Sequence, residues 1–387
     1  MVCPSLGETF KAEVTVRPVA TEKERGNQQQ DDGTVHFLQN YDYLCIFASC
    51  YTEYQMNLIK KTGWLILALA LFCGLSACKE EEEETTAESM SGAVIFDIPY
   101  YVLKGETVTM SASGVIYPET VNYKWFVSGV ISDTLSVNTI TVQFPDSIGV
   151  FTVAAFASAP GFYVNSSRQD VTTVDTTWNA SLTGLLRGTG SIVDARDGRS
   201  YDYVTLGELD WFSQNLAWQG TGVPFKASKA TAPMFGSFYT WEEAVEGQAC
   251  PAGWRVPTQA DWESLSAAMN GGTPLDFYGN WPGLGEKASA DARINGDRLW
   301  PYSPDNVHSN DFGWNALPLG YTFVSANGGL FDGVDYYGCW WSASEKNGDQ
   351  AFYRYIYSER SDFPVSYTSK NDMRASVRCV RTHPQSS

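Results

Sequence analysis

The sequence predicts a chain of two folded domains, an all-β sandwich followed by an α+β domain. Between residues 92 and 175, apolar and polar residues alternate with a period of two, which is typical of half-buried strands. After residue 192, two capped helices precede a series of apolar strand-like segments, an order typical of α+β domains. The part of the chain after residue 77 has just over 300 residues, which also favours two domains.

The first informative segment begins at Met56. Two lysines, Lys60 and Lys61, precede an apolar run at residues 64–75, and small residues precede Cys78. Residues 56–77 resemble a bacterial lipoprotein signal peptide, which implies cleavage before Cys78 and lipidation of that cysteine. The apolar run is shorter than the about 20 residues of a membrane span. We therefore expect the lipid to anchor the chain to the membrane.

The segments on either side of this signal have different interpretations. Residues 1–55 are polar and precede an export signal, so we interpret them as translation from an upstream start or as a disordered segment. The alternative is a genuine N-terminal domain with a membrane helix at 64–75. Residues 78–91 hold the acidic run Glu80 to Glu84, which indicates a solvated tether. This run also resembles the export signal of Bacteroidetes lipoproteins, which implies a surface-exposed protein of the outer membrane.

The charge balance argues against nucleic acid as a partner. The chain has 26 Lys and Arg residues against 44 Asp and Glu residues, a net charge of −18. Nucleic-acid recognition depends on basic side chains that neutralise phosphates. The expected partners are the membrane, through the lipid anchor, and an extracellular glycan or protein.

Three cysteines follow Cys78, namely Cys250, Cys339 and Cys379. In an oxidising compartment, two of three cysteines are expected to pair. A bridge between Cys250 and Cys379 would close a loop of more than a hundred residues. Cys339 lies in an apolar run, so we interpret it as a buried free thiol.

The alternating segments of the sandwich are short and are separated by turn residues. They include residues 107–112, 121–125 and 139–144, with turns at Lys104-Gly105 and Pro145-Asp146. The order GETVTMSASG, YKWFVSG, TITVQFPDSIGVFTVAAFASAPG resembles the immunoglobulin-like PKD family. This resemblance implies an immunoglobulin-like spacer or weak binding module at 92–175. Glycines then break the periodicity in a linker at 176–191.

Two short helices are predicted in the C-terminal domain. Thr240 and Glu243 have the spacing of a capping box. Thr258 caps the second helix with Asp261 three residues later, and the helix stops at Gly271-Gly272. Its buried stripe is expected to contain Trp262, Leu265 and Met269. Strand-like segments follow at 316–322, 337–342, 351–358 and 375–380.

Several motifs of this domain occur in a family order. They are DARDGRSYDYVTLGELDWFSQNLAW, GSFYTWEEAV, CPAGWRVPTQADWESL, FGWNALPLGY, YGCWWSAS, AFYRYIYS and SVRCVR. Together they resemble the Fibrobacter succinogenes major paralogous domain, over 192–381 and within a domain that we place at 192–383. The resemblance implies a variant of the C-type lectin fold, with a disulfide between Cys250 and Cys379.

The segment GWRVPTQADWESL is also similar to a signature of the formylglycine-generating oxygenases. Those enzymes need a two-cysteine copper site or a histidine cluster. The chain has three histidines, of which His36 precedes the signal and His383 lies near the end, so they cannot form such a cluster. We therefore expect no catalytic residues, and the oxygenase is the third hypothesis.

The tripeptides with which C-type lectins bind calcium and sugar are absent from the sequence. Asp305, Asn306, Asn310 and Asp311 could hold a cation, but we interpret them as the polarity of a solvated loop. No cofactor and no metal site are therefore assigned.

Aromatic side chains in the long Gly- and Pro-rich stretch are the predicted ligand-binding residues. Tryptophan rings stack on sugars, and loops on a rigid scaffold often carry function. The predicted surface consists of Trp281, Trp300, Tyr278, Tyr302 and Asn306.

The sequence thus predicts a lipid-anchored surface protein whose C-type-lectin-like domain binds a glycan or another extracellular surface without catalysis. The alternative is a structural or adhesive subunit of a cell-surface assembly. A cleft lined by Trp281 and Trp300 would favour ligand binding. An exposed strand edge or apolar patch without a concave polar pocket would favour assembly.

Overall fold

The computed structural model describes residues 87–131, 137–324 and 330–384. The segment 1–55, the signal peptide 56–77, Cys78 and most of the tether lie outside the described residues, so the predictions made for them are untested. No helix in the described part of the chain is long and apolar enough to cross a membrane.

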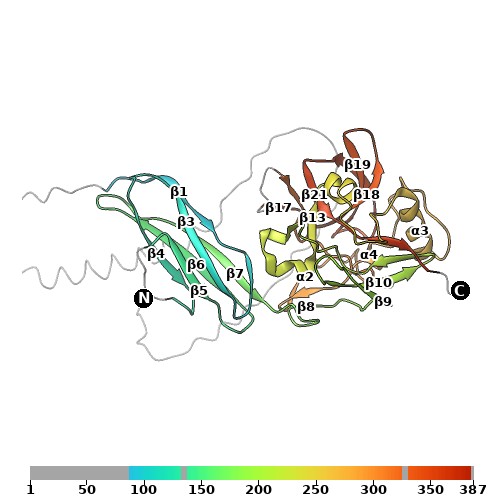
Figure 1. Ribbon diagram of the computed structural model, residues 1–387, viewed down its shortest axis with the longest axis horizontal. Coiled ribbons are helices and arrows are strands. Elements are labelled where there is room, and N and C mark those ends of the chain that lie inside the picture. The colour runs from blue at the N-terminus through green and yellow to red at the C-terminus, as the bar shows by residue number, and fades with distance from the viewer. Residues whose placement is uncertain (1–86, 132–136, 325–329, 385–387) are drawn as a thin grey trace, which may run out of the picture. The chain divides into compact units, whose positions relative to one another are not determined.

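The first described body consists of two β-sheets (Figure 1). One sheet has the strand order β1-β3-β5 and the other has the order β2-β7-β6-β4. All neighbouring strands are antiparallel except β2 and β7. The strands are β1 (Ser91–Asp97), β2 (Tyr101–Leu103), β3 (Thr107–Tyr117), β4 (Asn122–Val127), β5 (Thr139–Gln143), β6 (Gly149–Ser158) and β7 (Asn165–Val174).

The period of two in the sequence is the burial pattern of these strands. Met110 and Ala112 of β3 are buried, as are Tyr123 and Trp125 of β4. Strand β5 alternates between exposed and buried residues along its whole length. Because successive side chains of a strand point to opposite faces, alternate residues of each strand fill the space between the sheets. The all-β prediction for this region is confirmed.

The second body contains the remaining strands in three sheets. These have the orders β22-β11-β10-β9, β15-β14-β8 and β12-β13-β21-β18-β19-β20, with β16 and β17 extending the last to eight strands. The strands are β8 (Leu182–Thr183), β9 (Gly190–Val193), β10 (Ser200–Leu206), β11 (Leu209–Phe212), β12 (Val223–Pro224), β13 (Ser237–Tyr239), β14 (Arg293–Ile294), β15 (Asp297–Arg298), β16 (Tyr321–Phe323), β17 (Phe331–Asp332), β18 (Tyr337–Glu345), β19 (Gln350–Tyr357), β20 (Val365–Ser369), β21 (Met373–Ser376) and β22 (Val380–Thr382).

The helices of this body are few and short. The second predicted helix is α3, and its capping box between Thr258 and Asp261 is present. Trp262, Leu265 and Met269 are buried, as predicted. The first predicted helix is a single π-helical turn, η3, which nevertheless has both capping-box hydrogen bonds, of 2.8 and 3.1 Å. The helical elements are η1 (Phe225–Ala227), η2 (Lys229–Thr231), α2 (Ala232–Phe235), η3 (Glu242–Glu246), α3 (Gln259–Met269) and α4 (Leu284–Ala288).

Two of the four predicted strand segments differ from the structure. Residues 316–322 form a strand only from Tyr321 onward, after a buried stretch that forms two isolated bridges, Ala316 with Ser289 and Gly320 with Gly338. The segment 375–380 is divided between β21 and β22. The interruption contains Arg378, whose side chain hydrogen-bonds the end of β11, the loop that follows it and the loop at residues 314–315.

Candidate functional site

The predicted tryptophan surface does not exist, because Trp281 and Trp300 are 1% and 0% exposed. The guanidinium carbon of Arg354 lies 3.2 Å from the centroid of the Trp281 ring, and the indole N–H of Trp281 donates to the carbonyl of Asp276 (2.8 Å). Trp300 donates to the carbonyl of Ala316 (3.2 Å). The prediction that these rings form a ligand surface is therefore wrong, since both belong to the core.

The other three predicted residues differ in exposure: Asn306 is buried, whereas Tyr278 and Tyr302 lie at the surface. The side chain of Asn306 is buried, and its amide N–H donates to the carbonyl of Arg360 (3.1 Å). Tyr278 and Tyr302 are exposed, but the tryptophans that were expected beside them point inward. Asn306 is thus a structural residue, and the five predicted residues do not line a common cleft.

The interpretation of Asp305, Asn306, Asn310 and Asp311 as a solvated loop is correct only for the two aspartates. Asn310 is buried, and its amide exchanges hydrogen bonds of 2.7 and 3.0 Å with Asn315. The carboxylates of Asp305 and Asp311 are exposed. Across the described ranges, no group of three or more histidine, cysteine, aspartate or glutamate residues is placed to hold a metal ion.

A groove of about 340 Å³ crosses one face of the eight-stranded sheet. Its walls are mostly half-exposed aromatic rings, and its floor is formed by the buried sulfur-containing side chains of Cys339 and Met373. We call this hollow the tyrosine groove. It is lined by Tyr321, Phe323, Tyr337, Cys339, Tyr353, Tyr355, Ser366, Thr368 and Met373.

Strand register brings these side chains together. Cys339 of β18 lies opposite Tyr355 of β19, and Tyr353 lies opposite Ser366 of β20. The ring centroids of Tyr337 and Tyr355 are 6.0 Å apart, as are those of Tyr353 and Tyr355. Opposed residues share a face, so these side chains form one continuous surface.

Every side chain that lines the tyrosine groove is uncharged at neutral pH. Burial raises the pKa of Tyr353 to about 12. The pKa of Tyr321 is also raised to about 12, first by burial and then by the carboxylate of Asp332, to which its hydroxyl donates (3.0 Å). Burial likewise keeps the thiol of Cys339 protonated by raising its pKa. The groove therefore offers aromatic faces and neutral hydroxyl groups, and no ionised group lines it.

The tyrosine groove lies within a segment that matches a known protein family. Residues 204–381 match the model of the Fibrobacter succinogenes major domain. We refer to this matched part of the chain as the major domain. The match confirms the predicted resemblance over these residues and includes all nine that line the tyrosine groove. No curated protein and no solved structure matches the chain.

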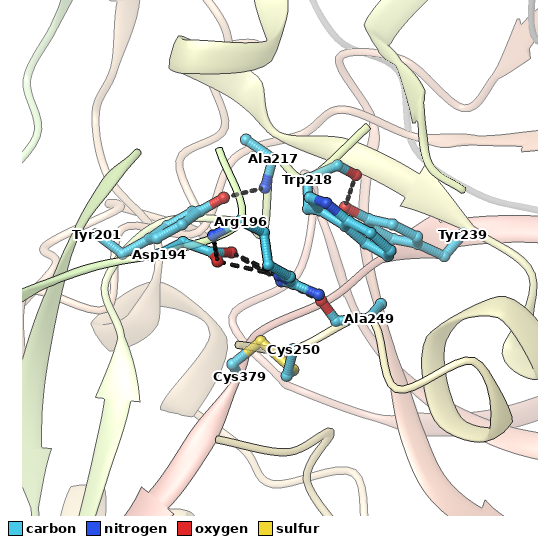
Figure 2. Close-up of a disulfide and its surroundings, with 9 residues drawn as sticks. All are labelled: Asp194, Arg196, Tyr201, Ala217, Trp218, Tyr239, Ala249, Cys250 and Cys379. Carbon is cyan, nitrogen blue, oxygen red and sulfur yellow. Dashed lines mark hydrogen bonds and ion pairs between the residues drawn. A yellow bond between two sulfur atoms is a disulfide. The ribbon is translucent and has the colours of Figure 1, made fainter. Parts of the chain in front are cut away.

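The disulfide implied by the family resemblance is present in the major domain. Cys250 is bonded to Cys379, which lies 129 residues later in the chain (Figure 2). Cys339 is a buried free cysteine, as predicted. The bridge joins the loop after η3 to the segment between β21 and β22.

Arg196 holds the chain beside this disulfide (Figure 2). Its guanidinium donates to both carboxylate oxygens of Asp194 and to the carbonyl of Ala249 (2.7 Å), the residue before Cys250. The same guanidinium lies 4.1 Å from the ring centroid of Trp218. Arg196 thus positions one end of the disulfide.

A second hollow, of about 620 Å³, lies beside the disulfide. Among the residues that line it, Trp254 is the one aromatic residue, and its side chain is buried. An aromatic ring that stacks on a ligand needs an exposed face. We therefore favour the tyrosine groove as the site.

The sequence contains a pattern that indicates the tyrosine groove, although none of the groove residues was among the predicted ligand-binding residues. In the motif AFYRYIYS, tyrosines alternate with Phe352, Arg354 and Ile356. A period of two predicts that the tyrosines share one face of a strand and that the other three residues share the opposite, buried face. Arg354 is indeed fully buried and donates to the backbone carbonyls of Phe277, Gly279 and Phe363.

We expect His308 to make the stability of the major domain depend on pH. Its ring stacks on Trp300, and burial lowers its pKa to about 4, against 6.5 for an exposed histidine. Between these values the unfolded chain binds a proton that the folded chain excludes, so stability is present above pH 6.5 and is lost as the pH falls toward 4. The free energy of unfolding should fall by about 2 kcal/mol more between pH 7 and pH 5 than in His308→Asn. Urea titrations at both pH values measure this difference. An equal change of the unfolding free energy with pH in the two proteins would contradict the prediction.

Proposed function

We propose that the major domain is a non-catalytic recognition module that binds a neutral extracellular glycan in the tyrosine groove. The observation that carries this proposal is the uncharged, aromatic and hydroxyl-lined hollow of about 340 Å³. This volume lies in the range of small-ligand sites, which combine an apolar lining with a few polar groups that orient the ligand.

The chemistry of a sugar ring complements this lining. One face of a pyranose presents C–H groups, which pack on an aromatic ring, whereas its edge presents hydroxyl groups that donate and accept hydrogen bonds. Tyrosine supplies both kinds of contact, and it has few rotatable bonds to immobilise on binding. The absence of charge in the lining favours a neutral sugar over a uronic acid or a phosphorylated sugar, because an anion would lose its hydration without gaining a counter-charge.

The cysteines support a binding function rather than oxygenase chemistry. Two of the three cysteines in the described part of the chain are bonded to each other, so they cannot supply a two-cysteine copper site. The third, Cys339, is 3% exposed, and its raised thiol pKa keeps it protonated. A reactive cysteine needs an accessible thiolate.

The rest of the chain is proposed to present this module at the cell surface. The lipoprotein signal at 56–77 supports lipidation of Cys78, and the acidic run after it supports a place on the outer face of the outer membrane. The two sheets of β1 to β7 support an immunoglobulin-like, PKD-type spacer. A C-type-lectin-like fold for the major domain is supported by its mixed helices and strands and by its long-range disulfide.

A structural or adhesive subunit remains the second candidate, and exposed apolar side chains of the sandwich favour it. Ile116, Tyr117, Tyr163 and Val164 are each more than half exposed. Contiguous exposed apolar residues commonly mark protein contacts. Sedimentation velocity of the full chain would favour this candidate if the protein self-associates and if Ile116→Lys abolishes the association.

Replacement of groove tyrosines is expected to remove glycan binding. We expect the full chain to bind neutral oligosaccharides on a glycan array and Tyr355→Ala to bind them about tenfold or more weakly, since a central aromatic contact is worth about 1.4 kcal/mol or more. Tyr355→Phe should have a smaller effect, because it removes only the hydroxyl group.

Tyr367→Ala is the matched control. Tyr367 is a 48% exposed tyrosine of β20, and its neighbours Ser366 and Thr368 line the groove, so it points to the opposite face. Binding that survives in Tyr355→Ala but not in Tyr367→Ala would refute the proposed site. Addition of a calcium chelator should leave binding unchanged.

A further inference from the structure

A separate pocket of about 210 Å³ lies where the segment 176–191 meets the body that contains the major domain. The elements around it, α2, β8 and β10, lie together in the lower part of Figure 1. It is lined by Thr176, Thr177, Trp178, Asn179, Leu182, Leu185, Arg187, Ser200, Asp202, Gln214, Pro233 and Met234. Most of these residues precede residue 204, so the pocket is built largely outside the family match.

Trp178 and Arg187 form a stacked wall of this pocket. The guanidinium carbon of Arg187 lies 3.9 Å from the centroid of the Trp178 ring, and the indole is still 39% exposed. The guanidinium also donates to the Oδ2 atom of Asp202 (3.2 Å). Because stacking and the ion pair restrain Arg187 together, its remaining donors are oriented before a ligand arrives.

Asp202 and Gln214 add polar groups to the same wall. The carboxylate of Asp202 is only 15% exposed. The Oδ1 atom of Asp202 accepts from no residue that the structure describes, whereas its Oδ2 atom is taken by Arg187. The amide of Gln214 donates to the carbonyl of Ser200 (3.3 Å), which fixes its orientation. A carboxylate acceptor and guanidinium donors thus lie beside an exposed indole.

This combination matches a pair of neighbouring sugar hydroxyls. One hydroxyl can donate to the carboxylate while the next accepts from the guanidinium, and bonds to ionised groups are stronger than neutral ones. The charges of Arg187 and Asp202 cancel, and the chain as a whole carries a net charge of −18. An anionic ligand is therefore disfavoured.

We propose that the pocket of Trp178, Arg187, Asp202 and Gln214 is a second carbohydrate site, which binds one neutral monosaccharide unit. Its volume of about 210 Å³ suits a single ring rather than a longer chain. The proposal does not depend on the tyrosine groove, because no residue lines both hollows. Two sites on one chain would strengthen attachment to a polysaccharide surface by multivalency.

Saturation-transfer NMR of the full chain tests this site. The probes are the methyl glycosides of D-glucose, D-galactose and D-mannose, with methyl D-glucuronide as the anionic probe. We expect at least one neutral glycoside to bind, and Trp178→Ala and Asp202→Asn each to weaken it about tenfold or more. Gln214→Ala should weaken it by a smaller factor.

Matched controls separate this site from the groove and from unfolding. Asp170→Asn removes an exposed carboxylate that also pairs with an arginine, and Tyr163→Ala removes an exposed aromatic ring of the sandwich. Neither control should change binding, nor should Tyr355→Ala in the groove. Each variant is accepted only with an unchanged thermal unfolding midpoint, and Trp178→Phe replaces Trp178→Ala if the latter unfolds.

Three results would overturn the proposal. They are failure of all neutral glycosides to bind, stronger binding of the glucuronide, and binding that survives in Trp178→Ala and Asp202→Asn. Loss of binding only in Tyr355→Ala would assign the sugar to the tyrosine groove alone. Loss only in the Trp178 and Asp202 variants would support this pocket, and the oligosaccharide array with Tyr355→Ala tests the tyrosine groove separately.

Discussion

Replacement of Cys250 and Cys379 together by alanine is expected to lower the free energy of unfolding of the major domain by about 3–5 kcal/mol. The disulfide joins residues 129 apart, so it removes many conformations from the unfolded chain. In chain-entropy models, the stabilisation grows with the logarithm of the loop length, and this loop is a long one. Urea unfolding followed by circular dichroism measures the effect, and a reducing agent should reproduce it in the unmodified chain.

The free cysteine supplies the control for this experiment. Cys339→Ala keeps the disulfide and removes one buried sulfur atom, so we expect a loss of about 1 kcal/mol. Reducing agent should destabilise Cys339→Ala as much as the unmodified chain and should leave the double variant unchanged. If the double variant is within about 1 kcal/mol of the unmodified chain in stability, other contacts hold the segments around Cys250 and Cys379 together.

Arg378→Met is expected to lower the free energy of unfolding by about 3–5 kcal/mol. The guanidinium of Arg378 is 1% exposed, and burial lowers its pKa to about 9. It donates to the side chain of Asn215 (2.8 Å) and to the carbonyls of Phe212, Trp314 and Asn315 (3.1, 2.5 and 2.8 Å). Methionine fills a similar volume but takes a donor away from each of these buried acceptors, although Asn215 keeps the indole N–H of Trp340 (2.9 Å).

Two further variants test this explanation. Arg378→Lys keeps the charge but cannot reach four separate acceptors with the same planar geometry, so it should recover only part of the loss. Arg293→Met removes an exposed arginine whose guanidinium donates to the carbonyl of Gly296 (3.2 Å), and it should change stability by less than about 0.5 kcal/mol. An Arg378→Met protein as stable as Arg293→Met would contradict a structural role for the buried guanidinium.

Much of the fold could be predicted because its signals are local. The capping box of Thr258 and Asp261 lies within four residues, and the alternation in β3, β4 and β5 lies within single strands. Hydrogen bonds at a helix end and the two faces of a strand depend on neighbouring residues alone. The family motifs are likewise short segments in a fixed order.

The predicted site failed because the exposure of a side chain is not a local property. Trp281 and Trp300 lie in an irregular Gly- and Pro-rich stretch, which is usually a sign of solvent-exposed loops. Here the stretch is drawn inward, since Arg354 donates to the carbonyls of Phe277 and Gly279 within it, and Trp281 packs on the same guanidinium. An arginine some seventy residues later in the chain thus holds Trp281 in the core.

The amino-acid sequence by itself determined the order of the all-β region and the mixed region, the caps, the period of the strands and the cysteines available for pairing. These properties follow from contacts between residues near one another in the chain, or from the small number of cysteines. Only the tertiary structure decided that tyrosines of β18 and β19 form one groove with β16 and β20, and that Trp178 and Asp202 line one pocket. The physical reason is that both hollows are assembled from strands and loops whose register is set by long-range packing.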